Sequence, residues 1–234
     1  MSKLGLCSRT QAIAMILAGR VSVAGNVECN PERPTTSGEL IRIDGKNVGT
    51  VERLYIALNK PRGLLVTATD NRDRETIFDL PTLSGLPYLA PVGRLDKASE
   101  GLLLMSNDSE WAAAIANPES GLLKTYHVQI SGIPDQRTLD ALLQGIEDNG
   151  EHLAVANARI LRSGEKNSWL EVALDEGRNR HLRRLLAAFD YEVLRLVRIA
   201  VGPVVLGSLA KGEWRALLAS ELQEIAKNSR PTSV

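Results

Sequence analysis

The succession of strands after residue 55 is the feature that most constrains how this chain can fold. Alternating apolar residues between turn residues predict strands at Tyr55–Leu58, Leu64–Thr67, Tyr88–Val92, Leu102–Met105, Thr125–Ile130, Leu153–Leu161, Trp169–Leu174 and Val193–Ala200. Helical spacing predicts helices at Glu110–Ala116, Gln136–Leu143, His181–Phe189 and Ser220–Lys227. Strands therefore follow strands more often than they alternate with helices. This order favours an α+β fold with a mixed sheet over a doubly wound parallel sheet.

The residues before this region read as a shorter α/β unit. Ser8 and Gln11 have the spacing of a capping box before an apolar helical run, and Gly19 is placed to end that helix. A hairpin turning at Ala24–Asn26 and a strand at Ile41–Ile43 follow. We expect four parts: a small module over residues 1–48, a linker over 49–54, a larger domain over 55–228 and a flexible tail over 229–234.

Charge and cysteine content narrow the class of protein. Lys plus Arg and Asp plus Glu are equal at 28 each, so the net charge of zero argues against a purely electrostatic nucleic-acid binder. Cys7 and Cys29 cannot form a disulfide framework, and we interpret them as thiols in a reducing compartment. The weakly polar stretch Ile199–Ala210 is too short to span a bilayer, and the N-terminus lacks the apolar core of a signal peptide. We expect a cytoplasmic monomer with no membrane association.

A carboxylate stands between two apolar strands in the segment from Pro91 to Leu104. The first strand runs into Gly93, Arg94 and Asp96 follow, and the second strand starts at Gly101. A rigid scaffold can hold such a carboxylate as a nucleophile or a general base, and Arg94 could cover a phosphate. An aspartate that closes a turn, with Arg94 paired to Glu100, is the alternative interpretation.

Two further segments carry polar groups that fit an RNA site. Glu176 to Arg184 opens a predicted helix with four arginines in eight residues, which suits phosphate recognition or a partner for Asp96 as well as a solvated helix face. In the strand that starts at Lys124, Tyr126 shares a face with Val128 and Ile130, so it either stacks on a base or packs in the core. The three histidines lack metal-ligand spacing, and no phosphate-binding glycine loop is present. We therefore expect neither a metal nor an organic cofactor.

Taken together, these segments resemble the motifs of the RsuA-type branch of the pseudouridine synthase family, in the family's order. The opening motif matches Asn59–Gly63, the catalytic motif Gly93–Leu103, the tyrosine motif Lys124–Tyr126 and the basic motif Glu176–Arg184. The N-terminal module resembles an S4 RNA-binding domain that is shortened at its start. The resemblance extends from Leu4 to about Ala226, and four ordered motifs outweigh the turn interpretation of Asp96.

The resemblance implies that the chain converts a uridine in RNA to pseudouridine by detaching the base from C1′ and rejoining it through C5. It implies a small S4-like module followed by a catalytic domain with a mixed, mostly antiparallel sheet flanked by helices. Asp96 would act on the ribose, Tyr126 would stack on the base, and Arg183 would pair with Asp96. Expected RNA contacts are Arg94, Lys60, Arg62, Lys124, Arg178, Arg180, Arg184, Arg9 and Arg20.

The substrate and two other function classes stay open at this point. The form of the basic motif, with Arg183 rather than lysine, is similar to that of the large-subunit rRNA members. The expected partner is therefore rRNA, either free or in a ribosome assembly intermediate. Small-subunit rRNA and tRNA are the alternatives. A non-catalytic RNA-binding assembly protein would be expected to have lost the aspartate or the tyrosine. A carboxylate-based hydrolase would need a second acid near Asp96, and only Glu100 is close in sequence.

Overall fold

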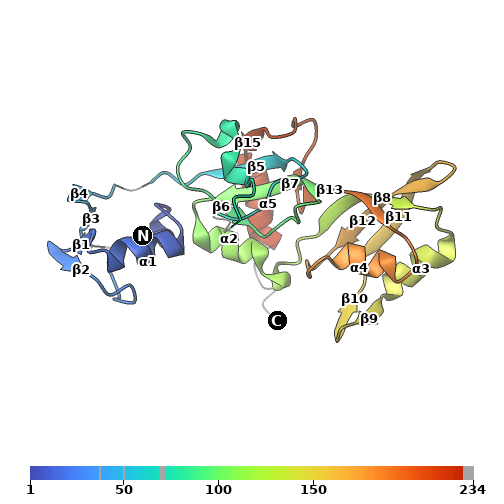
Figure 1. Cartoon of the computed structure of the whole chain (residues 1–234), viewed down its shortest axis with the longest axis horizontal. Coiled ribbons are helices and arrows are strands. Elements are labelled where there is room, and N and C mark those ends of the chain that lie inside the picture. Colours follow the sequence, from blue (N-terminus) through green and yellow to red (C-terminus); the bar gives the residue numbers. More distant parts are fainter. Residues whose placement is uncertain (37, 50, 69–71, 229–234) are drawn as a thin grey trace.

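A mixed sheet of nine strands forms the body of the molecule in the computed structural model, which describes residues 1–36, 38–49, 51–68 and 72–228 (Figure 1). The strand order is β11-β12-β8-β13-β7-β5-β15, with β14 paired to β13 and β6 paired to β7. These strands are β5 (Tyr55–Lys60), β6 (Ala90–Val92), β7 (Glu100–Ser106), β8 (Lys124–Ser131), β11 (Asn157–Ser163), β12 (Asn167–Leu174), β13 (Val193–Val201), β14 (Val204–Val205) and β15 (Trp214–Ala216). Neighbours pair antiparallel except β13 and β7, which are parallel. The expected α+β class with a mixed, mostly antiparallel sheet is confirmed.

Helices cover the sheet on different faces in its two halves. They are α2 (Ser109–Ala116), α3 (Gln136–Gln144), α4 (His181–Ala187) and α5 (Ala219–Asn228). One apolar cluster joins α3 and α4 to β8, β12 and one face of β5 and β7. A second cluster joins α2 and α5 to the other face of β5 and β7. Strands β7 and β13 each contribute residues to both clusters.

The N-terminal residues form a separate small sheet at one end of the molecule (Figure 1). Its order is β2-β1-β3-β4, with β1 (Val21–Val23), β2 (Asn26–Glu28), β3 (Ile41–Ile43) and β4 (Lys46–Asn47) beside helix α1 (Arg9–Leu17). The predicted capping box of Ser8 and Gln11 is present, because it satisfies two backbone N–H groups at the helix start. The resemblance of this unit to an S4 domain stays a prediction.

One side chain of the larger domain holds the segment between the two units. The Asn107 amide accepts a hydrogen bond from the Leu54 N–H and donates one to the Glu52 carbonyl, each at 2.8 Å. A β carbon on Gly5 would lie 2.9 Å from Asn107, so the first residues also contact this point closely. Thr50 of the predicted linker and the predicted tail over 229–234 lie outside the described residues.

Two predicted strands differ from the structure. Leu64–Thr67 contains only an isolated bridge from Leu65 to Thr76, because short 3-10 helices η2 (Ile77–Asp79) and η3 (Pro81–Leu83) take up the chain that a strand partner would need. Leu153–Leu161 divides into β10 (Glu151–Leu153) and β11, since the Val155 N–H bonds to the Leu142 carbonyl at the end of α3 and turns the backbone. The hairpin of β10 with β9 (Ile146–Asp148) had no periodic signal that predicted it.

Two further short 3-10 helices complete the element list, η1 (Ser2–Leu4) and η4 (Pro118–Ser120). No helix in the described ranges is long and apolar enough to cross a membrane.

Candidate active site

The Asp96 carboxylate projects from a loop whose backbone is held on every side. The loop connects β6 to β7, and Gly93 enters it with a φ of 71°. Its carbonyls at Asp96, Lys97, Ala98 and Ser99 all accept hydrogen bonds, from Ser99, Lys60, Gly63 and Arg183. The carboxylate itself has no ion pair or hydrogen bond within the described part of the chain. The fixed backbone holds the position of Asp96, and its carboxylate is available to a ligand.

The buried side chain of Lys60 is hydrogen-bonded to the backbone of this loop. Its ammonium donates to the carbonyls of Ser99 at 2.9 Å, Pro61 at 3.0 Å and Asp96 at 3.4 Å, and the residue is 0% exposed. Burial lowers the pKa of Lys60 to about 8, although the negative charge of Asp96 acts in the opposite direction. Lys60 was expected to contact RNA, but it has no exposed surface and bonds to three carbonyls of the chain, so that prediction is wrong.

Arg183 holds the loop from the side of α4. Its guanidinium donates to the Val193 carbonyl at 3.0 Å and to the Ala98 carbonyl at 3.4 Å, which ties the loop to α4 and β13. The predicted ion pair with Asp96 is not found among the described residues, where Arg183 bonds to carbonyls instead. Burial lowers the pKa of Arg183, the charge of Arg180 lowers it further, and the charge of Asp96 opposes both.

Tyr126 lies on the buried face of β8, as its alternation predicted. The burial pattern of β8 alternates, with Tyr126, Val128 and Ile130 buried. In the sheet register Tyr126 is directly opposite Arg198 of β13, so the two side chains share one face. Arg198 is 5% exposed and was not among the predicted site residues. The sequence offered only one indication of Arg198, a charged residue within an apolar predicted strand.

A cavity of about 380 Å³ lies between the Asp96 loop, the sheet and the start of α4. Asp96, Tyr126, Leu174, Leu196 and Val201 are among its lining residues. The cationic side chains that line it are Arg94, Lys124, Arg178, Arg180, Arg183 and Arg198, and the carboxylates are Asp96 and Glu176. Because Glu176 is paired with Arg178 at 2.6 Å, the cavity has a large excess of positive charge, which suits a nucleotide of RNA.

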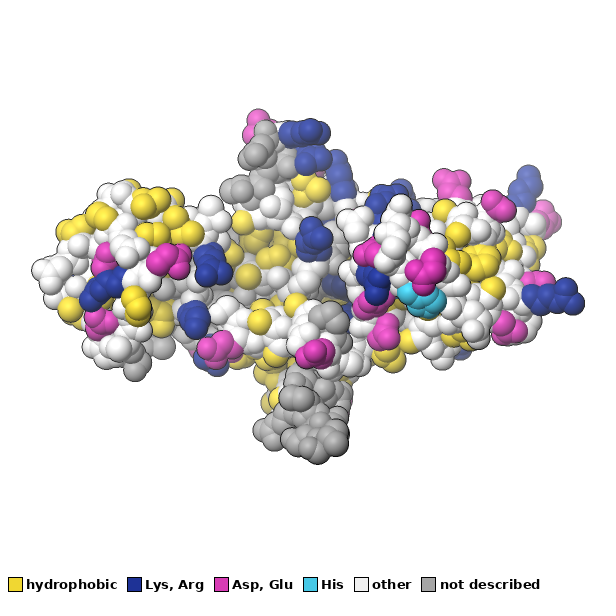
Figure 2. Space-filling model, turned by 90° about the horizontal axis from the view of Figure 1, so that it is seen from below, with side chains coloured by type: hydrophobic (Ala, Val, Ile, Leu, Met, Phe, Trp, Pro, Cys, Tyr) yellow, Lys and Arg dark blue, Asp and Glu magenta, His cyan; other side chains and the backbone are white. Residues whose placement is uncertain are grey.

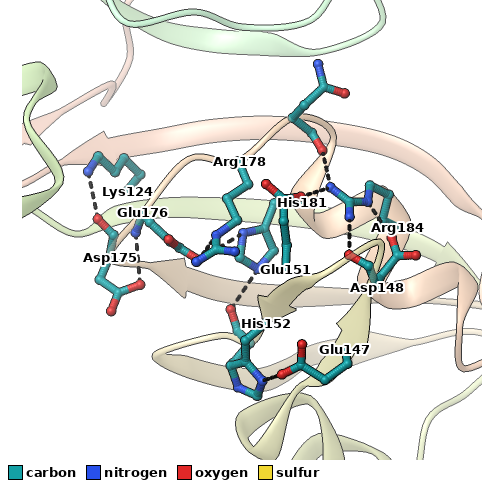
Figure 3. Close-up of polar contacts among 12 residues, drawn as sticks. Lys124, Glu147, Asp148, Glu151, His152, Asp175, Glu176, Arg178, His181 and Arg184 are labelled. Carbon is teal, nitrogen blue, oxygen red and sulfur yellow. Dashed lines mark hydrogen bonds and ion pairs between the residues drawn. The ribbon is translucent and has the colours of Figure 1, made fainter.

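The arginines of the basic motif separate into those that line the cavity and Arg184, whose ion pairs Figure 3 shows. Arg180 is exposed at the start of α4 with a φ of 51° and lines the cavity. Arg184 instead bonds to Asp148 and Glu151 of the β9–β10 hairpin at 2.5 Å each. Arg184 is absent from the cavity wall, so the predicted RNA contact is replaced by a structural ion pair.

Figure 3 also shows how Lys124 and His181 are held. The Lys124 ammonium donates to the Asp175 carbonyl at 2.9 Å, and burial, followed by the charge of Arg198, lowers the pKa of Lys124. His181 is buried, bonds to the Ala154 carbonyl through Nε2 at 2.8 Å, and has its pKa lowered by burial. The neutral imidazole therefore fixes the start of α4 to the chain after β10.

The remaining predicted RNA contacts lie outside the cavity or at its mouth. Arg94 lines the cavity and is exposed. Arg62 is exposed nearby, and its charge lowers the pKa of Arg183. In the N-terminal module Arg9 is exposed on α1, whereas Arg20 forms a two-bonded ion pair with Asp44. Figure 2 shows basic and acidic side chains interspersed over one face, with hydrophobic side chains on the floor of its hollowed middle and basic side chains beside it.

No group of three or more His, Cys, Asp or Glu residues that could hold a metal ion occurs in the described ranges. Cys7 is buried, Cys29 is exposed, and both are free thiols. The titratable groups that line the cavity include the Asp96 carboxylate, Tyr126 and several cations.

Comparisons with known proteins agree with this geometry. The family profile described as RNA pseudouridylate synthase matches residues 54–188, which include Asp96, Tyr126 and Arg183. The chain belongs to the RNA pseudouridylate synthase family. A relative from Aquifex aeolicus named as an uncharacterized RNA pseudouridine synthase is 40% identical over 235 residues, which cover 97% of this chain and 92% of that protein. The ribosomal large subunit pseudouridine synthase B of Bacillus subtilis is 33% identical, over 94% of this chain and 91% of that protein.

A solved structure extends the likeness to the whole chain. The crystal structure of a pseudouridylate synthase superimposes with a TM-score of 0.65 and 29% identity, over 95% of each chain. This pseudouridine synthase therefore acts on RNA by isomerising uridine, and the hydrolase alternative is set aside.

Proposed function

We propose that this pseudouridine synthase modifies a uridine of large-subunit rRNA, with Asp96, Tyr126 and Arg183 as its catalytic residues. The observation that carries the proposal is the free Asp96 carboxylate on a fully bonded loop, at the wall of a cationic cavity that also contains Tyr126. The large-subunit rRNA assignment rests on the form of the basic motif and on the printed name of the Bacillus subtilis relative. Small-subunit rRNA and tRNA are the alternatives that the test below separates.

The chemistry assigns one task to each group. A target uridine must leave its helix to reach the cavity, which costs a few kcal/mol of stacking and pairing. Tyr126 stacks on the extruded base, and exposed Arg94 takes the place that the base leaves. Asp96 acts on the ribose at C1′ while the base is detached and turned. Arg183 lies close enough for the charge of Asp96 to act on it, and it holds the loop through the Ala98 carbonyl.

The cations at the mouth of the cavity bind the RNA backbone in this proposal. Arg180 and Lys124 line the wall, and Arg62 lies outside it, whereas Arg178 lines the wall with its charge paired to Glu176. The N-terminal module adds Arg9 as an exposed contact, in the manner of an S4 domain. We place the activity in the cytoplasm, on rRNA in an assembly intermediate, and we expect the active species to be a monomer.

Two experiments test this assignment. Base-resolution pseudouridine mapping of rRNA and tRNA from a strain lacking the protein identifies the substrate; loss of a single pseudouridine from large-subunit rRNA is expected, and loss from tRNA alone would refute the rRNA assignment. Asp96→Asn, which is nearly isosteric, is expected to abolish turnover and leave RNA affinity within about three-fold of the parent, since the carboxylate makes no structural bond. Substantial turnover by Asp96→Asn would refute its catalytic role.

A further inference from the structure

Arg198 is a buried arginine whose charge no acidic side chain neutralises. It is 5% exposed, and no carboxylate lies within 4.0 Å of it in the ranges that the structure describes. Its Nε donates to the Leu102 carbonyl at 2.7 Å, and its Nη2 has no hydrogen-bond partner. An arginine in this position is costly to the free protein, so it is expected to serve a ligand.

The position of Arg198 identifies that ligand as the base of the target nucleotide. Arg198 lines the cavity directly opposite Tyr126 across the β8–β13 pair. Apolar Leu174, Leu196 and Val201 complete this part of the wall, which suits a flat ring rather than a hydrated phosphate. The exposed cations at the mouth, Arg94 and Arg180, are the groups that a phosphate would meet first.

We propose that Arg198 is a further catalytic residue that stabilises the negative charge of the detached uracil. This inference rests on the proposed function of the same cavity. When the C1′–N1 bond breaks, its electron pair stays with the base, and the resulting anion shares its charge among N1, O2 and O4. The C5 atom then bonds to C1′, the C5 proton leaves and N1 gains a proton, so substrate and product have the same atoms and charge. Nη2 of Arg198 donates to a base oxygen, where that charge collects.

A buried guanidinium is well suited to this task. A donor that is fixed before the reaction and surrounded by apolar groups stabilises developing charge more strongly than water does. Lys124, whose pKa the charge of Arg198 helps to lower, adds to the positive field in the same part of the wall.

The test compares neutral and charged substitutions in the full chain. Arg198→Gln keeps a donor for the Leu102 carbonyl and removes the charge, whereas Arg198→Lys keeps the charge. Arg195→Gln is the matched control, because Arg195 lies on the same strand, pairs with Glu100 and is absent from the cavity wall. The substrate is an rRNA fragment that contains the mapped uridine with tritium at C5, and the readout is tritium release in a single turnover at saturating RNA.

We expect Arg198→Gln to lower the single-turnover rate about 100-fold, with Arg198→Lys between it and the parent and Arg195→Gln unchanged. The dissociation constant for RNA should change less than three-fold, and the thermal midpoint of Arg198→Gln should not fall. A raised dissociation constant with an unchanged saturated rate would place Arg198 on a phosphate and overturn the proposal. Unfolding of Arg198→Gln would assign Arg198 a structural role and also overturn it.

Failure of the Arg198 proposal and failure of the proposed function would give different results. An active parent protein with an equally active Arg198→Gln variant refutes only the role of Arg198. A parent protein that releases no tritium from any rRNA fragment refutes the substrate assignment instead.

Discussion

Replacing Lys60 by methionine tests whether buried hydrogen bonds to the loop backbone place Asp96. The change removes the ammonium but keeps an unbranched side chain of similar length. Of the three carbonyls that Lys60 contacts, Asp96 also accepts from the Ser99 N–H at 2.9 Å. The carbonyls of Pro61 and Ser99 lose the donor that Lys60 provides.

The expected change in stability is the difference between two terms. Two buried carbonyls without a donor cost about 1–3 kcal/mol each. Against this, the pKa of Lys60 falls from 10.5 to about 8 on burial, and at about 1.4 kcal/mol per unit the removal of this strained charge returns roughly 3 kcal/mol. We therefore expect Lys60→Met to change the free energy of unfolding by between a gain of about 1 kcal/mol and a loss of about 3 kcal/mol, so the variant should fold.

Turnover should fall much more than stability. A displacement of about 1 Å at a reacting group costs on the order of 100-fold in rate, and the loop loses two of its anchors in this variant. The assays are urea denaturation and single-turnover tritium release from uridine labelled at C5. Lys97→Met is the control, because Lys97 is exposed on the same loop and is absent from the cavity wall. Turnover by Lys60→Met equal to that of Lys97→Met would refute the view that Lys60 positions Asp96.

Four further predictions follow from the same structure. Because the folded pKa of Lys60 lies below its unfolded value, the parent should gain stability relative to Lys60→Met as pH rises from about 8 toward 10.5; parallel stability profiles of the two proteins would contradict this. Gly101→Ala should lower the free energy of unfolding by about 3 kcal/mol or more, since its β carbon would lie 2.3 Å from the Arg198 carbonyl oxygen; Gly85→Ala, which has the same sign of φ and open space, controls for backbone strain in urea titrations. Tritium release should persist in EDTA with no added small molecule while the RNA stays folded, and activity that zinc alone restored would refute this. A chain starting near Arg53 should fold and retain some turnover at high RNA concentration, with an affinity loss that is larger at low salt than at high salt; affinity and turnover equal to the full chain would refute RNA capture by residues 1–48.

Helix starts and the buried faces of strands could be predicted from the sequence, because both depend on residues close together in the chain. The capping box of Ser8 and Gln11 begins α1 as predicted, and the alternation around Tyr126 assigned its buried face. The division of Leu153–Leu161 was not predictable in this way, because Leu153 and Val155 are both buried and alternate as in a continuous strand. A long-range hydrogen bond to α3, which periodicity does not report, breaks the strand between them.

The motifs identified the chemistry of the site but not which partner each cation would have. Lys60 belongs to a motif near the catalytic residues, yet only the tertiary fold buries it under the loop. Arg180 and Arg184 are equivalent in sequence terms, one helical turn apart. The unpredicted β9–β10 hairpin places Asp148 and Glu151 beside Arg184 and not beside Arg180. The charge of Arg184 is therefore paired within the protein and is not offered to RNA.

The partners of these cations explain how a chain of zero net charge can hold a strongly positive site. Arg178 and Arg184 face carboxylates and are neutralised, whereas Arg183 bonds only to carbonyls and Arg198 to one carbonyl. Carbonyl partners fix a guanidinium in place without cancelling its charge, so the positive field is retained at the cavity wall. A field built this way acts over roughly one Debye length, about 8 Å at physiological salt, and is too short to draw RNA from a distance. The charge inside the cavity therefore acts mainly on the nucleotide that enters it.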